Sequence, residues 1–176
     1  MSDSKLFKEK RKKTSTMKIR KFQEKDAEQI IQLHHETLQA INSQHYTPEQ
    51  LAAFSMKNTN PERLNLSYAK ALATIVATEK SQVICFGNIG KNGHLRQLYT
   101  HKEHQRKGAA KQVLRELERQ AILARLGEVT LASSLTAHTW YQQQGYQDIE
   151  RNTLHFKGIP MEVITMRKTL DPEKIF

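Results

Sequence analysis

A short apolar run, a basic turn and a long amphipathic segment follow one another between residues 94 and 126. The run, which includes Leu95 and Leu98, is typical of a strand. From Val113 onward, apolar residues recur at helical spacing. The turn between them reads Gln-Arg-Lys-Gly-Ala-Ala over residues 105–110. We therefore expect a strand, a tight loop and a helix, a combination typical of folds that mix sheet and helix.

This loop has the properties of an anion-binding corner. A helix N-terminus leaves its first four N–H groups unpaired and carries a partial positive charge. Gly108 allows close backbone approach or a positive φ, and Arg106 and Lys107 add formal charge. Phosphate groups bind at such corners. The alternative is an ordinary turn with a solvated basic face, and six residues alone do not decide between the two.

Residues 105–110 resemble the Q/R-x-x-G-x-G/A signature of GNAT N-acetyltransferases, whose backbone amides hold the pyrophosphate of acetyl-CoA. A P-loop is excluded because no Gly-Lys-Ser/Thr follows, and a Rossmann fingerprint because its first two glycines are missing. Residues 134–146 resemble the family's N-x-x-A-x-x-F-Y-x-x-x-G-F/Y segment. Residues 43–51 are similar to an H-Y-S/T-P-x-Q segment of the bacterial YafP-like subgroup. The resemblance covers residues 17–170.

The fold that the resemblance implies is α/β: the GNAT acyl-CoA N-acyltransferase fold, with a central mixed twisted sheet of about seven strands and helices on both faces. We expect Asp26 to cap the first helix, with Gln29 at capping-box spacing. The last two strands should pair through a turn at residues 157–160. The predicted strands are 17–22, 72–78, 83–89, 94–100, 128–132, 146–156 and 161–168. Five helices are predicted: one after Asp26, one from Pro48, one over residues 61–70, one after Gly108 and one over residues 136–144.

The length of 176 residues fits one domain with a core of its own. We expect a disordered basic arm at 1–16, a single GNAT domain at 17–170 and a C-terminal tail at 171–176. The formal charge is +10, and the arm holds six Lys and Arg against two acidic residues. Such a charge suits a phosphate-bearing ligand, but it also allows nucleic acid or an anionic membrane as a partner. We also hypothesise that Met17 is an alternative translation start.

The single cysteine, Cys85, rules out an internal disulfide and is compatible with a reducing cytoplasm. Because it lies in an apolar run, we expect a buried and inert thiol. The sequence has no apolar stretch long enough to span a membrane and no signal-peptide core. We therefore expect a cytoplasmic protein without a membrane partner. Whether the chain forms a homodimer is left open.

The resemblance implies acetyl-CoA as the cosubstrate and an anchor in the amide row of residues 106–111. We expect no metal, because His101 and His104 lack a further ligand at useful spacing. Ser134 stands where many relatives have Asn, and its hydroxyl still offers a hydrogen bond to the cofactor. The predicted cofactor-binding residues are Leu98, Tyr99, Thr100, Gln105, Arg106, Lys107, Gly108, Ala109, Ala110, Lys111, Ser134, Thr136 and Tyr141.

Acetyl transfer needs a polarised carbonyl and a proton for the leaving thiolate. Tyr141 matches the family tyrosine near the CoA sulfur, and its phenol, with an ordinary pKa of about 10, can act as the general acid. The alternative is an aromatic core residue of its helix. The resemblance also implies a backbone contact to the oxyanion from the strand before the loop, at Leu98 or Tyr99. For the general base the candidates are His45, Glu49 and His94.

His45 and Tyr46 are the predicted acceptor-facing residues, because the family uses this region to wall the acceptor pocket; packing of the loop onto the sheet is the alternative. Arg96 is a third candidate. Relatives often have an acidic residue at its position. The arginine implies either a base elsewhere or an acceptor with a carboxylate or phosphate that pairs with Arg96.

Together these features predict an N-acetyltransferase that moves the acetyl group of acetyl-CoA to a primary amine by direct attack in a ternary complex. The acceptor is a small molecule or an amine of a peptide or protein. One alternative is a non-catalytic sensor module that binds acyl-CoA. The other is a nucleic-acid-binding protein that uses its basic arm, which is less favoured because the sequence has no nucleic-acid-binding motif.

Overall fold

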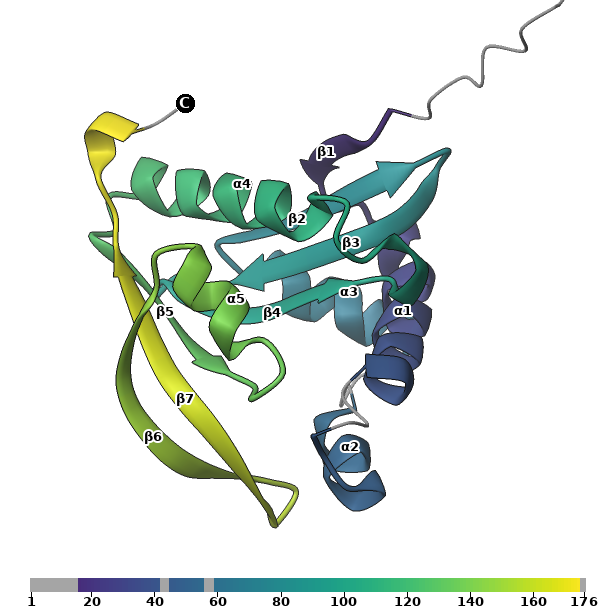
Figure 1. The fold of residues 1–176 in the computed structure, drawn as a ribbon. Coiled ribbons are helices and arrows are strands. Elements are labelled where there is room, and N and C mark those ends of the chain that lie inside the picture. The colour runs from purple at the N-terminus through teal and green to yellow at the C-terminus, as the bar shows by residue number, and fades with distance from the viewer. Residues whose placement is uncertain (1–15, 42–44, 56–58, 175–176) are drawn as a thin grey trace, which may run out of the picture.

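Within the described residues, 16–41, 45–55 and 59–174 of a computed structural model, seven strands form one sheet in the order β1-β2-β3-β4-β5-β7-β6 (Figure 1). Neighbouring strands are antiparallel except β4 and β5, which are parallel. The predicted mixed sheet is thus confirmed. The predicted basic arm, apart from Thr16, lies outside the described residues. The strands are β1 (Lys18–Lys21), β2 (Ala73–Glu79), β3 (Gln82–Ile89), β4 (His94–Thr100), β5 (Glu128–Ser133), β6 (Gln147–Phe156) and β7 (Ile159–Thr169).

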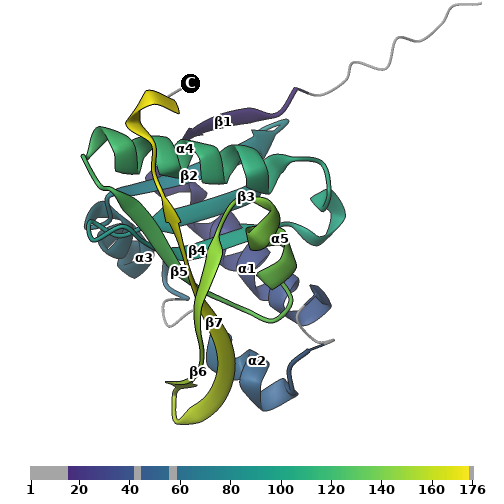
Figure 2. The same cartoon turned by 60° about the vertical axis from the view of Figure 1, so that its left-hand side comes forward.

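Helices lie on both faces of the sheet, with α4 and α5 on one face and α1 and α3 on the other (Figures 1 and 2). α2 packs instead against the distal part of the β6–β7 hairpin. No helix within the described residues combines the length and the apolarity needed to cross a membrane. The helices are α1 (Ala27–Ile41), α2 (Pro48–Phe54), α3 (Pro61–Ala69), α4 (Ala109–Leu123) and α5 (His138–Gln143), with 3-10 turns η1 (Glu24–Asp26), η3 (Lys102–His104) and η4 (Pro172–Lys174).

The central strands are buried on both faces, which explains why their sequences are continuously apolar. In β3, Cys85 packs into the core beneath α4, and Phe86 packs into the core beneath α1 and α3. α4 lies very close to the strand at Gly87. A Cβ at Gly87 would come within 2.6 Å of the Leu117 Cδ1 atom. Glycine therefore permits the short distance between helix and sheet.

Asp26 does not cap α1 as predicted. It is the third residue of η1, a turn that precedes α1 and aims the carboxylate back toward β1. The side chain is almost fully buried, and it accepts hydrogen bonds from Arg20 at 2.6 and 2.8 Å and from the Gln23 amide at 2.8 Å. Gln29, the predicted capping partner, instead accepts the Val83 N–H at 2.8 Å. Asp26 thus connects η1 to β1, and Gln29 connects α1 to β3, so that neither side chain caps the N-terminus of α1.

The β6–β7 connection is also shorter than predicted. Lys157 and Gly158 have φ values of 51° and 79°, so two residues with positive φ make the whole turn. Such a turn follows the natural twist of the two strands. Pro160 belongs to β7, and its carbonyl accepts a hydrogen bond from Gln50 at 3.1 Å. Its nitrogen therefore faces away from β6, where a missing N–H costs no ladder hydrogen bond.

Replacement of Asp26 by Asn should lower the free energy of unfolding by about 2 kcal/mol at neutral pH, because Arg20 loses its charged partner. Burial tends to raise the pKa of Asp26, but its bonds to Arg20 and Gln23 outweigh burial and lower that pKa overall. The ionised form therefore stabilises the fold above about pH 4, and this stability is lost as the pH falls through the lower folded pKa. Urea unfolding of both proteins from pH 7 down to pH 3 measures the difference, which should shrink with acidity.

The exposed Glu24 of the same turn supplies the control, and Glu24→Gln should change stability little at any pH. A difference between the native protein and Asp26→Asn that stays constant with pH would contradict the electrostatic account.

Candidate functional site

The strands β4 and β5 pair over only two residues each, the first two of β4 and the middle two of β5. Their ladder, within the described residues, consists of His94 with Thr130 and Leu95 with Leu131. Beyond Leu95, β4 continues to Thr100 beside β3, whereas β5 continues beside β7 (Figure 1). One edge of β4 is therefore without a partner strand in the middle of the sheet. We call residues 96–100 along this edge the β4 free edge.

A β-bulge lies where the two strands separate. The register between β3 and β4 shifts between Asn88 and Ile89, so that Arg96 is an extra residue between Leu95 and Gln97. A bulge bends its strand and changes which face each later side chain occupies. The change in register therefore decides what the free edge presents.

Side chains after the bulge occupy the opposite faces from those that simple alternation predicts. Leu95 and Leu98 both contact the core beneath α4, although they are three residues apart. Tyr99 lies on the other face, where its ring stacks on Phe86 at 5.8 Å and contacts His34 edge-on at 4.5 Å between centroids. The buried His34 on α1 was not predicted to reach this strand.

Backbone amides along the β4 free edge alternate in direction. The His101 N–H donates to the Ile84 carbonyl of β3 at 2.8 Å. Because successive amides of a strand point to opposite sides, the Tyr99 N–H also points toward β3. The N–H groups of Leu98 and Thr100 therefore point away from β3, toward the free edge. Of the two predicted oxyanion contacts, Leu98 has its amide on the free edge, whereas the Tyr99 amide points toward β3.

The carbonyl of Thr100 is already satisfied on this edge. It accepts hydrogen bonds from the Gln105 side-chain amide at 2.6 Å and from the Thr37 hydroxyl of α1 at 3.1 Å. Gln105, predicted to bind the cofactor, thus closes the loop onto the end of β4. Thr37 was not predicted, and its only signal in the sequence was a polar residue on the buried face of α1, four positions after Leu33.

The loop between β4 and α4 presents unpaired amides. Arg106 and Gly108 have φ values of 60° and 84°, both in the left-handed region. Gly108 is the N-cap of α4, no side chain of the described residues caps that terminus, and the first turn contains no acidic residue. The first intrahelical bond of this end runs from the Gln112 N–H to the Gly108 carbonyl. Residues 109–111 therefore offer free N–H groups, as expected of an anion-binding corner.

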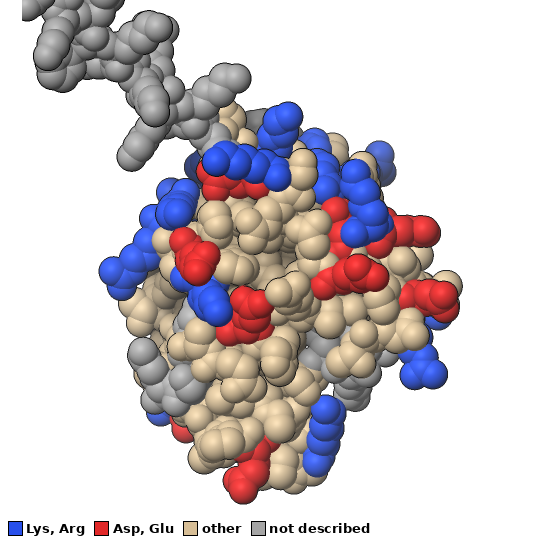
Figure 3. All heavy atoms as spheres, turned by 90° about the vertical axis from the view of Figure 1, so that its right-hand side faces the viewer, with Lys and Arg blue, Asp and Glu red and all other residues tan. Residues whose placement is uncertain are grey.

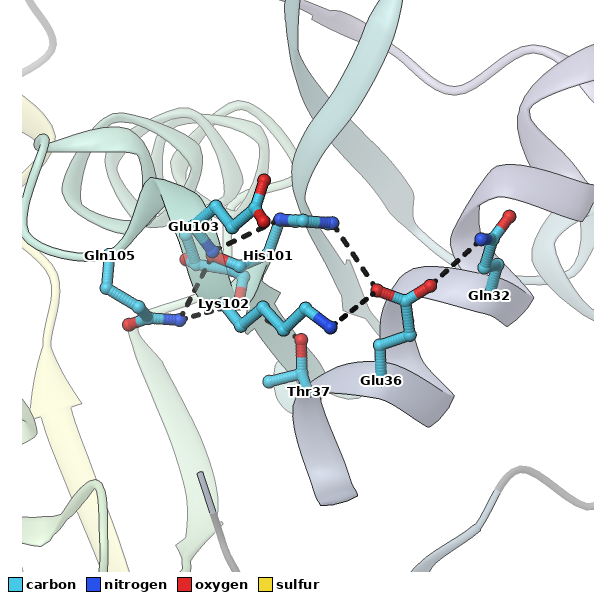
Figure 4. A network of polar contacts seen from close by, with 8 residues as sticks. Gln32, Glu36, Thr37, His101, Lys102, Glu103 and Gln105 are labelled. Carbon is cyan, nitrogen blue, oxygen red and sulfur yellow. Dashed lines mark hydrogen bonds and ion pairs between the residues drawn. The ribbon is translucent and has the colours of Figure 1, made fainter. Parts of the chain in front are cut away.

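Glu36 on α1 connects that helix to the same loop (Figure 4). Its carboxylate lies 3.4 Å from the Lys102 ammonium and 3.6 Å from the His101 Nε2, and it accepts a hydrogen bond from Gln32 at 2.9 Å. The Nδ1 of His101 accepts the Glu103 N–H at 3.2 Å, which begins η3. The hydrogen bond from Gln32, followed by that from Lys102, lowers the pKa of Glu36. Nothing in local sequence spacing signals this contact, because it joins residues far apart in the chain.

Tyr141 of α5 is 7% exposed and packs between Trp140 and Tyr146, at ring-centroid distances of 5.1 and 5.6 Å. Burial, followed by the proximity of Tyr99 and Cys85, raises the pKa of its phenol. The phenol thus stays protonated and can donate a hydrogen bond at neutral pH. Cys85 is buried as predicted, and burial raises the pKa of its thiol to about 12, which keeps it un-ionised.

The segment between β5 and α5 faces the free edge from the other strand. Tyr46 accepts the Leu135 N–H on its hydroxyl at 2.9 Å, and Ser134 accepts the Ala137 N–H at 3.2 Å. α5 begins at His138 rather than at residue 136 as predicted, because these bonds hold a turn first. The Thr136 hydroxyl oxygen is buried and has no hydrogen-bond partner within the described residues. An orphaned buried hydroxyl of this kind fits a bound polar ligand.

The three base candidates do not lie together. His45 and Glu49 are exposed at the start of α2. His94 contacts the Thr130 hydroxyl at 3.1 Å, about 13 Å along the strand from Leu98. Burial, followed by the charge of Arg96, lowers the pKa of His94, so its ring is neutral at neutral pH.

Comparison with known proteins decides the class of this arrangement. A family model described as an acetyltransferase (GNAT) domain matches residues 42–170. The chain belongs to the GNAT acetyltransferase family. The family confirms the predicted fold and the predicted enzyme class, an N-acetyltransferase.

Named relatives of this GNAT chain agree with the assignment. The uncharacterised N-acetyltransferase YafP of Escherichia coli K12 is 22% identical over 145 residues, 82% of this chain and 90% of its own, in line with the predicted subgroup. A GCN5-related N-acetyltransferase from Rhodopseudomonas palustris is 21% identical, with a TM-score of 0.82 over 89% of this chain and 97% of that one. PaiA N-acetyltransferase from Thermoplasma acidophilum, solved with coenzyme A, is 19% identical, with a TM-score of 0.74 over 88% of this chain and 99% of that one.

Glu36→Gln should loosen the loop of the GNAT domain, because a neutral amide cannot pair with the ammonium of Lys102. We expect amide hydrogen exchange of residues 102–105 to accelerate about two- to fivefold at low salt. High salt should bring the native protein closer to the variant, because it screens the ion pair. The exposed Glu28 of α1 provides the control, and Glu28→Gln should leave exchange in the loop unchanged. Equal exchange in all three proteins would show that Glu36 does not stabilise the loop.

Proposed function

We propose that the chain transfers the acetyl group of acetyl-CoA to a primary amine, of a small molecule or of a peptide or protein, by direct attack in a ternary complex. One observation carries the proposal: the β4 free edge, with the Leu98 and Thr100 amides turned outward, leads directly to the uncapped N-terminus of α4. A thioester and a pyrophosphate of one cosubstrate need these two features side by side. The coenzyme A complex of PaiA N-acetyltransferase supports the same interpretation.

The anchor in this proposal is the first turn of α4. The N–H groups of residues 109–111 bind the pyrophosphate, and Arg106 and Lys107 add charge without pairing to a carboxylate within the described residues. The amide-bearing arm of the cosubstrate then continues along the β4 free edge, where it hydrogen-bonds as a strand would. The orphaned Thr136 hydroxyl and Ser134 take polar atoms of the arm from the opposite strand.

Two groups of the protein act in the chemical step. The amine nitrogen attacks the thioester carbon, a C–N bond forms and the C–S bond breaks. The Leu98 N–H stabilises the negative charge that develops on the carbonyl oxygen. Tyr141 donates a hydrogen bond to the departing thiolate. Because the phenol pKa is raised above that of a thiol, Tyr141 stabilises the thiolate more readily than it transfers a proton to it.

The amine must also lose a proton. His45 and Glu49 are solvent-accessible at the start of α2, next to Tyr46 at the end of the free edge, and they are our candidates for direct or water-mediated transfer. His94 is neutral at neutral pH and can accept a proton, but its distance from Leu98 requires a chain of water molecules.

Gly108→Glu should abolish binding of acetyl-CoA, with affinity reduced about 100-fold or more, because a carboxylate at the N-cap repels phosphate and the backbone there needs a positive φ. Calorimetric titration of the full chain measures this. Gly127→Glu is the matched control, since Gly127 lies beyond the far end of α4, has no positive φ, and would have no atom within 4 Å of an added Cβ.

This titration, combined with assays of thiol release and of nucleic-acid binding, separates the transferase from the two alternative functions. Binding with thiol release across an amine panel supports the transferase, whereas binding without release from any amine favours the acyl-CoA sensor. Nucleic-acid binding that falls steeply with salt and disappears on deletion of residues 1–16 would favour a nucleic-acid-binding protein that uses its basic arm. On the side that Figure 3 shows, Lys and Arg concentrate toward one end, but Asp and Glu are interspersed among them. Ion pairs such as that of Lys102 with Glu36 also offset positive charge.

Tyr141→Phe should lower kcat about tenfold or more and leave the KM for acetyl-CoA within about twofold, because the hydroxyl acts only on the developing thiolate. The raised pKa predicts that the native rate does not fall through phenol ionisation up to about pH 10. Steady-state thiol release between pH 6 and pH 10 checks both points. Tyr68→Phe is the control, since the Tyr68 hydroxyl is also buried but bonds Gln97 at 2.7 Å. An equal loss of kcat in both variants would contradict the role assigned to the Tyr141 hydroxyl.

A further inference from the structure

The C-terminal end of α5 places Tyr146 against Tyr141. Gly145 has a φ of 91°, and its N–H donates to the Gln142 carbonyl at 3.0 Å. The Tyr146 N–H donates to the Tyr141 carbonyl at 3.1 Å. These two bonds form a Schellman motif, in which a left-handed glycine ends a helix. Such a motif often brings the two side chains that frame it into contact, and here the rings of Tyr141 and Tyr146 meet edge-on at 5.6 Å between centroids.

The hydroxyl of Tyr146 is held by a residue of another helix. It donates to the Glu118 carboxylate of α4 at 3.0 Å, in a position where Tyr146 is only 3% exposed. Burial, followed by the charge of Glu118, raises the pKa of the Tyr146 phenol well above its ordinary value. The phenol therefore keeps its proton at neutral pH and remains the donor of this bond.

Lys168 of β7 neutralises the carboxylate that accepts this bond. Its ammonium donates to the two oxygens of Glu118 at 3.0 and 2.9 Å and lies 5.6 Å from the centroid of the Tyr146 ring. The Glu118 side chain is 12% exposed, so the lysine supplies the opposite charge that a nearly buried carboxylate needs. A cation over a ring face adds further attraction. We call Glu118, Tyr146 and Lys168 the Tyr146 clamp.

Tyr141 depends on its neighbours for its orientation. Its own hydroxyl forms no hydrogen bond within the described residues, so packing between Trp140 and Tyr146 places the ring. α5 has six residues, and a helix of that length is marginal without tertiary contacts. Trp140 belongs to this same short helix, whereas Tyr146 is bonded to α4. Tyr146 therefore connects the Tyr141 ring to a part of the fold outside α5.

We propose that Tyr146 is a positioning residue for acetyl transfer: the clamp keeps the Tyr141 hydroxyl directed at the leaving thiolate. This inference rests on the proposed function, which gives Tyr141 its role. Tyr146 and Glu118 contact no substrate in this account and act only through Tyr141. A hydroxyl that must meet a sulfur atom as the C–S bond breaks loses rate when it is misplaced by as little as about 1 Å.

Tyr146→Phe tests the hydroxyl without emptying the core, because phenylalanine keeps the ring. We expect kcat to fall about three- to tenfold and the KM for acetyl-CoA to stay within about twofold. Steady-state thiol release with the most active amine of the panel measures both. Tyr68→Phe removes another buried, hydrogen-bonded hydroxyl and should keep kcat within about twofold of the native value. A native kcat in Tyr146→Phe would overturn the proposal.

A double-mutant cycle separates positioning from general stability. In the Tyr141→Phe background no hydroxyl is left to position, so Tyr146→Phe should lower kcat further by less than about 1.5-fold. A residue that only stabilises the fold would cost the same factor in both backgrounds. Equal factors would therefore overturn the proposal.

Glu118 gives a second route to the same clamp. Glu118→Gln keeps an oxygen that accepts a hydrogen bond from the Tyr146 hydroxyl, whereas Glu118→Ala leaves none. We expect Glu118→Ala to reproduce the kcat of Tyr146→Phe, and Glu118→Gln to retain at least about half of the native kcat. Glu116→Gln is the matched control, since Glu116 lies on the same helix but pairs with Arg119. A native kcat in Glu118→Ala would contradict the clamp. Where thermal unfolding shows that one variant does not fold, the other decides.

A measurement without turnover separates this inference from the proposed function. Fluorine NMR of the full chain carrying 3-fluorotyrosine reports how fast the Tyr141 ring flips, and the loss of its signal in Tyr141→Phe assigns it. Ring flips should be about threefold faster or more in Tyr146→Phe and Glu118→Ala than in the native protein, and unchanged in Tyr68→Phe.

The combined results distinguish the two proposals. If no amine releases thiol, the transferase proposal fails, and the ring flips alone judge the clamp: faster flips in the variants would support it, and unchanged flips would overturn it. If thiol is released and Tyr141→Phe keeps the native kcat, the role of Tyr141 fails and this inference fails with it. If Tyr141→Phe is slow but Tyr146→Phe is not, the proposed function stands and this inference alone is overturned.

Discussion

An unpaired strand edge inside a sheet is costly, because every N–H and carbonyl along it loses a ladder partner. In this GNAT chain the β4–β5 ladder consists of two residue pairs, and the bulge at Arg96 turns the rest of β4 away. Thr37 and Gln105 donate hydrogen bonds to the Thr100 carbonyl. The amides of Leu98 and Thr100 point away from β3, to the side where β4 has no partner strand among the described residues. We propose that this unpaired edge holds the cosubstrate.

In our proposal, the positive charges near this edge lie where the phosphates of the cosubstrate bind. At its C-terminal end, the basic loop and the α4 terminus attract the phosphates of the cosubstrate, and Glu36 holds that loop to α1.

Local signals predicted well where local physics dominates. β4 spans the predicted residues 94–100, and the α4 N-terminus lies at Gly108 as the loop motif indicates. The predictions failed where a distant partner competes for a side chain. Asp26 pairs with Arg20 on β1 instead of capping α1, and Gln29 bonds Val83 on β3. Gly158, by contrast, sits in a two-residue turn that local propensity allows, but the pattern alone could not exclude a longer one.

The sequence by itself determined the fold class, the family and the loop that we propose as the anion site, because glycine conformation, helix termini and apolar periodicity act over a few neighbouring residues. Only the tertiary structure decided which amides of β4 are free and that Thr37 and Glu36 support the loop. Those facts depend on strand register and on a bulge. A shift of one residue moves every following side chain to the other face, and the register is set by pairing between segments far apart in the chain.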